Sequence, residues 1–119
     1  MAQAKKFLEL ADVVGTEREE PAAADGAASL AILAGIAASD AACCAVLGRR
    51  SRSRNHVDAE VLLREIYPAG ESAAKALRRL LSLKDKANYG IESVSGKDLD
   101  AVMNQAKTLV AFADETVRQ

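Results

Sequence analysis

Residues 35–63 read GIAASDAACCAVLGRRSRSRNHVDAEVLL, and this stretch decides how the chain is interpreted. It begins in an Ala-rich apolar helix that carries one acid, Asp40, and is expected to end at Gly48. A loop with four arginines follows, at Arg49, Arg50, Arg52 and Arg54. The only histidine, His56, then begins the next helix. Because Asp, Arg and His are residue types that bind or cleave phosphodiesters, this junction is the first candidate site.

Hydrophobic spacing on either side of this stretch predicts a chain of helices. The expected helices cover residues 3–14, 21–47, 55–66, 72–86 and 95–117, and the second of them begins at either Pro21 or Asp25. Ser95 is expected to cap the last helix, and Tyr67–Gly70 to separate the third from the fourth. The stripe of the second helix expected to face the core is Leu33, Ile36, Ala37, Asp40, Cys44 and Leu47. We therefore expect an all-α domain over residues 1–119: an up-and-down antiparallel four-helix bundle with a short accessory N-terminal helix.

Composition limits the partners of the chain. Half of its residues are hydrophobic but only 3% are aromatic, so alanine must supply much of the core and a second subunit is expected to complete it, as a homodimer. The net charge of −1 leaves only local patches for nucleic-acid binding.

Location is inferred from three features. Cys43 and Cys44 are adjacent in a helix, where an unstrained disulfide between them is implausible, so free thiols are expected to fill the core in a reducing compartment. The N-terminus lacks an apolar signal core. Residues 27–47 are long enough to raise the question of a membrane span, but serines, Gly35 and Asp40 interrupt them. We expect a cytoplasmic protein that does not enter a membrane.

The chemistry of the junction has alternative interpretations. Asp40 either fixes the register by pairing with a nearby donor, or orients a cation or histidine in a pocket between helices. His56 is either a capping residue or a catalyst. We expect it near the C-terminal end of the second helix, about 10 Å along the axis of that helix from Asp40. The loop arginines either complement the end of the second helix or cradle phosphate. Further basic residues on the fourth helix extend the patch if they share its face: Lys75, Arg78, Arg79, Lys84 and Lys86.

The sequence contains no motif for a metal site or for other common catalytic or cofactor-binding chemistry. One histidine without an acidic cluster or a CxxC motif argues against zinc, and the motifs of serine hydrolases, P-loop proteins and dinucleotide-binding proteins are absent. No cofactor is expected.

Residues 30–89 resemble the HEPN superfamily of small helical bundles, most closely an actinobacterial branch. The resemblance rests on AGIAASDAACC, LGRRSRSRNHVDAEVLL and LRRLLSLKDKANYG, with matches at Asp40, Gly48, Arg52, His56, Leu62, Leu63, Lys84, Ala87 and Tyr89. It implies a dimeric bundle in toxin–antitoxin, defence or nucleotidyltransferase-linked systems.

Two functions follow from this resemblance. The first is a binding module linked to RNA or nucleotides, or to a partner protein, with ligand-binding residues Asp40, Arg49, Arg52, Arg54, Lys84 and Tyr89. The second is a metal-independent ribonuclease toxin that uses an Arg-x(4–6)-His pair, here Arg50 and His56. In superfamily members that cleave RNA this motif usually lies later, near the last core helix, where the present chain has Tyr89 but no histidine.

Overall fold

The structure is a computed structural model that describes residues 1–48, 57–89 and 94–118, with the side chains of residues 57 and 85–89 left out. Within these ranges the protein is all-α, with no strand. The helices are α1 (Ala2–Gly15), α2 (Pro21–Leu47), α3 (Val57–Arg64), α4 (Gly70–Tyr89) and α5 (Gly96–Arg118). The predicted helices are therefore all present, and the bounds differ from the expected ones by a few residues.

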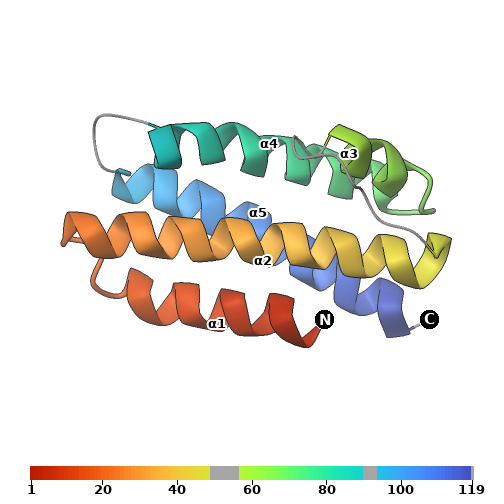
Figure 1. Cartoon of the computed structure of the whole chain (residues 1–119), viewed down its shortest axis with the longest axis horizontal. Helices are drawn as coiled ribbons and strands as arrows, with labels where there is room; N and C mark the ends of the chain where they lie inside the picture. The colour runs from red at the N-terminus through yellow and green to blue at the C-terminus, as the bar shows by residue number, and fades with distance from the viewer. Residues whose placement is uncertain (49–56, 90–93, 119) are drawn as a thin grey trace.

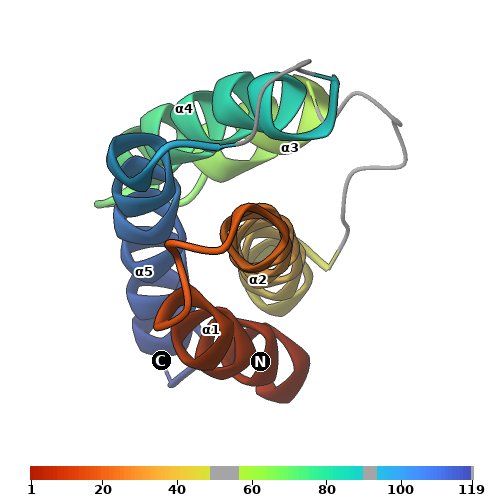
Figure 2. The same cartoon turned by 90° about the vertical axis from the view of Figure 1, so that its left-hand side faces the viewer.

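Helix α2 lies at the centre of the molecule and packs against each of the other four helices. Helix α1 covers one side of the α2–α5 pair, and α4 covers the opposite side together with the short α3 (Figure 2). Helices α2 and α5 run in one direction along the long axis, whereas α1 and α4 run in the other (Figure 1). This arrangement encloses one continuous core built largely from alanine and leucine.

Helix α1 is an integral layer rather than the accessory element expected from the sequence. Ala4 and Ala11 are fully buried against the rest of the core. The Nζ atom of Lys5 lies 2.8 Å from Oδ1 of Asp114 on α5, which ties the two helices together. The shortest of the described helices is instead α3, with eight residues.

The buried face of α2 differs from the predicted stripe. Leu33 is 46% exposed and Cys44 is exposed, while the buried residues are Ala24, Ala27, Ala28, Ala31, Ile32, Ala34, Gly35, Ala38, Ser39, Ala42 and Cys43. Ile36, Ala37 and Leu47 of the predicted stripe are partly buried and pack against the core. The prediction was wrong for Leu33 and Cys44, because α2 is apolar around most of its circumference and hydrophobic spacing does not determine which side faces inward. Packing selects the side with the smallest residues, where neighbouring helices approach most closely.

Local signals for the helix ends are confirmed at two positions. Gly48 adopts a left-handed conformation with φ of 69°, and its N–H donates to the carbonyl oxygen of Cys44. The backbone N–H of Asp98 donates to Oγ of Ser95 at 3.1 Å, as a capping residue requires. The predicted break near Pro68 is also present, but α4 begins at Gly70. A side chain at position 70 would collide with the carbonyl oxygen of Leu63, so the position requires glycine.

Candidate functional site

Most of the residues in the predicted junction site lie outside the described part of the chain. These are Arg49, Arg50, Arg52, Arg54 and His56. Asp40 and Lys84 are described, and both are partly buried. Tyr89 is the last residue of α4, and its side chain is not among those described.

The structure does not bring Asp40 and Lys84 together. Gly35 of α2 faces Leu80 of α4, and these two helices run in opposite directions (Figure 1). Asp40 lies five residues beyond Gly35, and Lys84 lies four residues beyond Leu80 in the opposite direction. At about 1.5 Å per residue, the two positions are separated by about 13 Å along the helix axes. Asp40 does have an interaction partner, in keeping with the expectation that a carboxylate there needs one.

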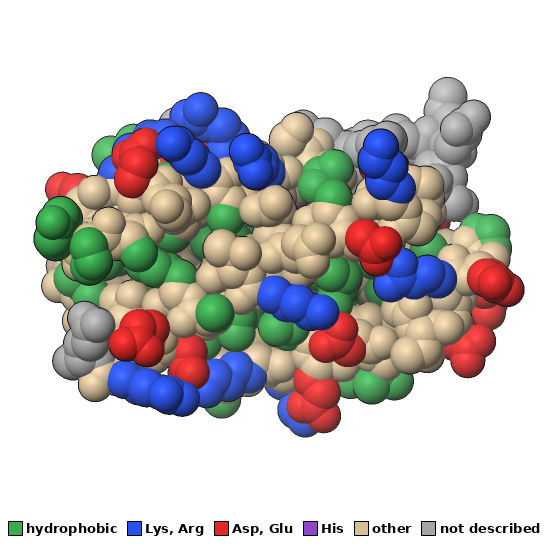
Figure 3. Space-filling model, turned by 180° about the vertical axis from the view of Figure 1, so that it is seen from behind, with side chains coloured by type: hydrophobic (Ala, Val, Ile, Leu, Met, Phe, Trp, Pro, Cys, Tyr) green, Lys and Arg blue, Asp and Glu red, His purple; other side chains and the backbone are tan. Residues whose placement is uncertain are grey.

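The basic residues of α4 divide between two faces of the helix. Lys75, Arg78 and Arg79 follow the i, i+3, i+4 spacing of one helix face and are all exposed. The buried Leu77 and Leu80 lie on the opposite face of the helix. Lys84 continues that inner face, so it does not extend the outer one. We call Lys75, Arg78 and Arg79 the α4 basic stripe. Figure 3 shows Lys and Arg side chains gathered along the edge of the molecule that α4 forms.

Only one member of the α4 basic stripe has an acidic partner among the described residues. Nε of Arg78 donates to Oε1 of Glu60 on α3 at 2.9 Å. Lys75 and Arg79 make no hydrogen bond or ion pair with the described part of the chain. Two cations are therefore available to an external anion, and a third is held in place by its carboxylate.

A groove of about 420 Å³ lies between α4 and α5, next to the stripe. Its lining residues are Arg78, Arg79, Ser82, Leu83, Ala101 and Gln105. Sequence reasoning did not single out Ser82 or Gln105, because each stands alone in an amphipathic pattern and only the packing of α4 on α5 brings them together. Two guanidinium groups, a hydroxyl and an amide can all donate hydrogen bonds, and none of the described lining residues is a carboxylate.

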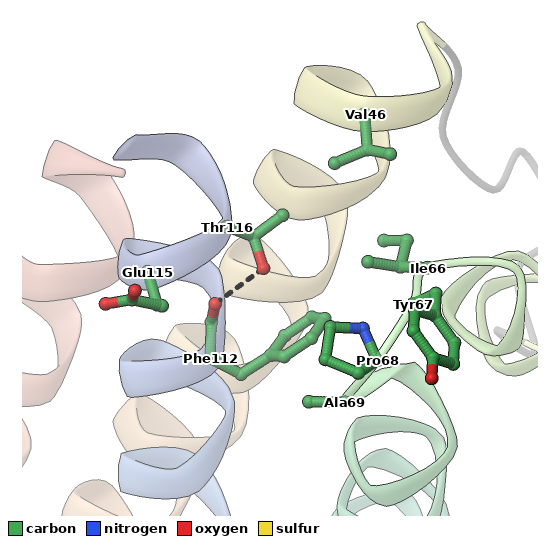
Figure 4. Close-up of a pocket in the computed structure, with 8 residues that line it drawn as sticks. All are labelled: Val46, Ile66, Tyr67, Pro68, Ala69, Phe112, Glu115 and Thr116. Carbon is green, nitrogen blue, oxygen red and sulfur yellow. Dashed lines mark hydrogen bonds between the residues drawn. The ribbon is translucent and has the colours of Figure 1, made fainter. Parts of the chain in front are cut away.

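A second cavity, of about 430 Å³, lies at the end of the molecule where α2 and α5 finish. Its walls are mainly apolar and include the ring of Phe112 beside Pro68, with Tyr67 and Ile66 across from them (Figure 4). The hydroxyl of Thr116 donates to the carbonyl oxygen of Phe112 at 2.8 Å. None of its described lining residues is a cation, in contrast to the α4–α5 groove.

The two adjacent cysteines differ in burial. Neither cysteine is in a disulfide, and only Cys43 is buried, so the expectation that Cys44 also fills the core was wrong. The side chain of Cys44 points away from the buried side of α2. The described residues contain no group of three or more His, Cys, Asp or Glu side chains placed to hold a metal ion.

Helix α2 is long and apolar enough to cross a membrane by length and composition alone. This is weak evidence, since the core helix of a soluble protein passes the same test. In this fold α2 uses its apolar surface against α1, α3, α4 and α5.

No family model, curated protein or solved structure matches this chain.

Proposed function

We propose that this protein is an RNA-binding module: a HEPN-like, up-and-down helical bundle that acts as a cytoplasmic homodimer in a toxin–antitoxin or defence context. The observation that supports RNA binding is the α4 basic stripe, with two exposed cations that lack a described partner. Arginine and lysine bind phosphate oxygens, and phosphate contacts supply most of the affinity of sequence-independent binding.

The position of the stripe supports a role in binding rather than in folding. Its three side chains point away from the core, and even Arg78, which pairs with Glu60, has 64% of its side chain exposed. Exposed ion pairs contribute little to stability, so these cations are not needed to hold the helices together. Because the net charge of the chain is −1, attraction for RNA must come from a local cluster of this kind.

Neutralising the two unpaired cations tests the proposal. Fluorescence anisotropy with a labelled single-stranded RNA would compare the wild type with the double variant Lys75→Gln/Arg79→Gln. The matched control is Lys6→Gln/Lys107→Gln, which removes the same charge from surface pairs on α1 and α5. We expect the α4 variant to bind at least tenfold more weakly at about 50 mM salt, and the control to stay within about twofold. Equal loss in both variants, or none in either, would contradict the proposal.

The ribonuclease alternative assigns His56 as general acid and base and Arg50 as the group that stabilises the phosphate in the transition state. Both residues lie outside the described part of the chain.

A further inference from the structure

The groove between α4 and α5 combines two properties that a plain basic patch lacks. Arg78 and Arg79 stand on its α4 wall, while Leu83 and Ala101, both partly buried, give it an apolar surface. Gln105, also partly buried, adds an amide that can both donate and accept hydrogen bonds. A volume of about 420 Å³ falls within the range of ordinary small-molecule sites.

These properties restrict the occupant. A divalent cation finds no carboxylate among the described lining residues, and a purely apolar ligand would leave the guanidinium group of Arg79 without a partner. A simple anion would satisfy the arginines but leave Leu83, Ala101 and Gln105 unused. A ligand that contacts all of these lining residues has a phosphate group attached to a larger group with both apolar and hydrogen-bonding surface.

We infer that the α4–α5 groove holds one ribonucleotide unit, with its phosphate on Arg79 and its sugar and base against Leu83, Ala101 and Gln105. This inference rests on the proposed RNA binding and gives that function a defined site. Arg79 is the phosphate ligand because it has no partner among the described residues, whereas Nε of Arg78 is bound to Glu60. Gln105 meets the polar edge of the base or the ribose hydroxyls.

The test is a set of NMR titrations of the whole chain with adenosine 5′-monophosphate, adenosine and inorganic phosphate, each added separately. We expect the monophosphate to shift the amide resonances of Arg79, Ala101 and Gln105 and to bind at least tenfold more tightly than adenosine or phosphate. If inorganic phosphate binds as tightly as the nucleotide, the groove recognises only an anion and the inference is overturned. Nucleotide-induced shifts that avoid Ala101 and Gln105 would overturn it as well.

Gln105→Leu removes the amide without changing charge or the approximate size of the side chain. The matched control is Asn104→Leu, at an exposed neighbour on α5 that does not line the groove. We expect Gln105→Leu to weaken binding of the nucleotide at least fivefold and leave that of phosphate unchanged, and Asn104→Leu to alter neither. Equal effects of the two variants on nucleotide binding would contradict the assignment of Gln105.

The same variants separate this inference from the proposed function. RNA binding that depends on Lys75 and Arg79 but is unaffected by Gln105→Leu would overturn the groove and leave the proposed function in place. Conversely, nucleotide binding in the groove by a protein that does not bind RNA would support the groove and overturn the proposed function.

Discussion

Leu80 of α4 occupies the space that a side chain at Gly35 of α2 would need. A Cβ atom at position 35 would collide with Cδ2 of Leu80 and lie 3.2 Å from Cδ1 of Leu109 on α5. Both leucines are fully buried, so neither has free space into which it can turn. The absence of a side chain at one position thus allows three helices to meet at the centre of the core.

Replacing Gly35 by alanine is therefore expected to destabilise the protein by about 1–2 kcal/mol, because overpacking of the core outweighs the gain in helix propensity. Gly26 on the same helix is the matched control, since a Cβ there would meet only Cγ1 of Val14, at an ordinary 3.8 Å. Gly26→Ala should stabilise by about 0.5–1 kcal/mol. Urea unfolding measures the free energy of unfolding of both variants. Equal changes in the two variants would show that the core accommodates a side chain at position 35.

The link between α1 and α5 is expected to make stability depend on pH. The hydrogen bond from Lys5 lowers the pKa of Asp114 from its ordinary value of 3.8, and the charge of Arg118 acts in the same direction, while desolvation opposes them. The folded-state pKa thus lies below the unfolded-state pKa, so the stabilisation is complete above the unfolded-state pKa. It is lost as the pH falls through the folded-state value.

Asp114→Asn should accordingly be less stable than the wild type at pH 7, with the difference narrowing as the pH falls below about 4. Thermal unfolding across this range measures the effect, and Lys5→Gln should reproduce most of it. A constant difference between wild type and Asp114→Asn at every pH would show that the asparagine acts through packing instead.

Binding of RNA by the α4 basic stripe is expected to weaken with salt. If Lys75 and Arg79 each replace counterions on a single strand, the logarithm of the association constant should fall with the logarithm of the salt concentration at a slope of about −1.4. The Lys75→Gln/Arg79→Gln variant should have a slope close to zero. An unchanged slope would mean that the cations that contact RNA lie elsewhere.

The ribonuclease alternative and the proposed module differ in what His56→Ala does. For a binding module, wild type and variant should both bind RNA equally and leave it intact during long incubation. Cleavage by the wild type in the presence of EDTA, lost in a His56→Ala variant with unchanged circular dichroism, would establish the ribonuclease instead.

The homodimer expected from the alanine-rich composition is tested by light scattering. The measured mass should be about twice the 12.5 kDa of one chain. A mass of one chain at concentrations well above those used for RNA binding would remove the dimer from the proposal.

Helix existence and helix ends follow from the sequence because their causes are local. Gly48 ends α2 through its left-handed backbone, and Ser95 caps α5 through its own hydroxyl. The buried side of α2 does not follow, because Leu33 and Cys44 are as apolar as the residues that are buried. The buried residues of α5 from Leu99 to Ala113 recur at helical spacing with polar residues on the other face, so the orientation of this helix does follow from its sequence.

The candidate site was less predictable than the fold. The density of arginines pointed to residues 49–54, and an acid within an apolar helix pointed to Asp40. Lys84 was one of the basic residues of the fourth helix, and Tyr89 came from the family resemblance alone. The packing of α4 on α2 instead separates Lys84 from Asp40 by about 13 Å along the helix axes. The two helices are antiparallel, so positions further along each chain from the Gly35–Leu80 contact lie in opposite directions. Gln105 and Arg79 are 26 positions apart in sequence, and they line one groove only because α4 packs on α5.

The adjacent thiols of α2 supply an internal reference for measuring how often the core opens. Cys44 is exposed and should react with a maleimide or disulfide reagent in the native protein, whereas Cys43 is 1% exposed and must wait for α2 to separate from its neighbours. Because both sulfur atoms share one helix and one solvent, the ratio of their labelling rates reports the opening equilibrium at the centre of the molecule. One preparation of the unmodified chain thus contains both the probe and its standard.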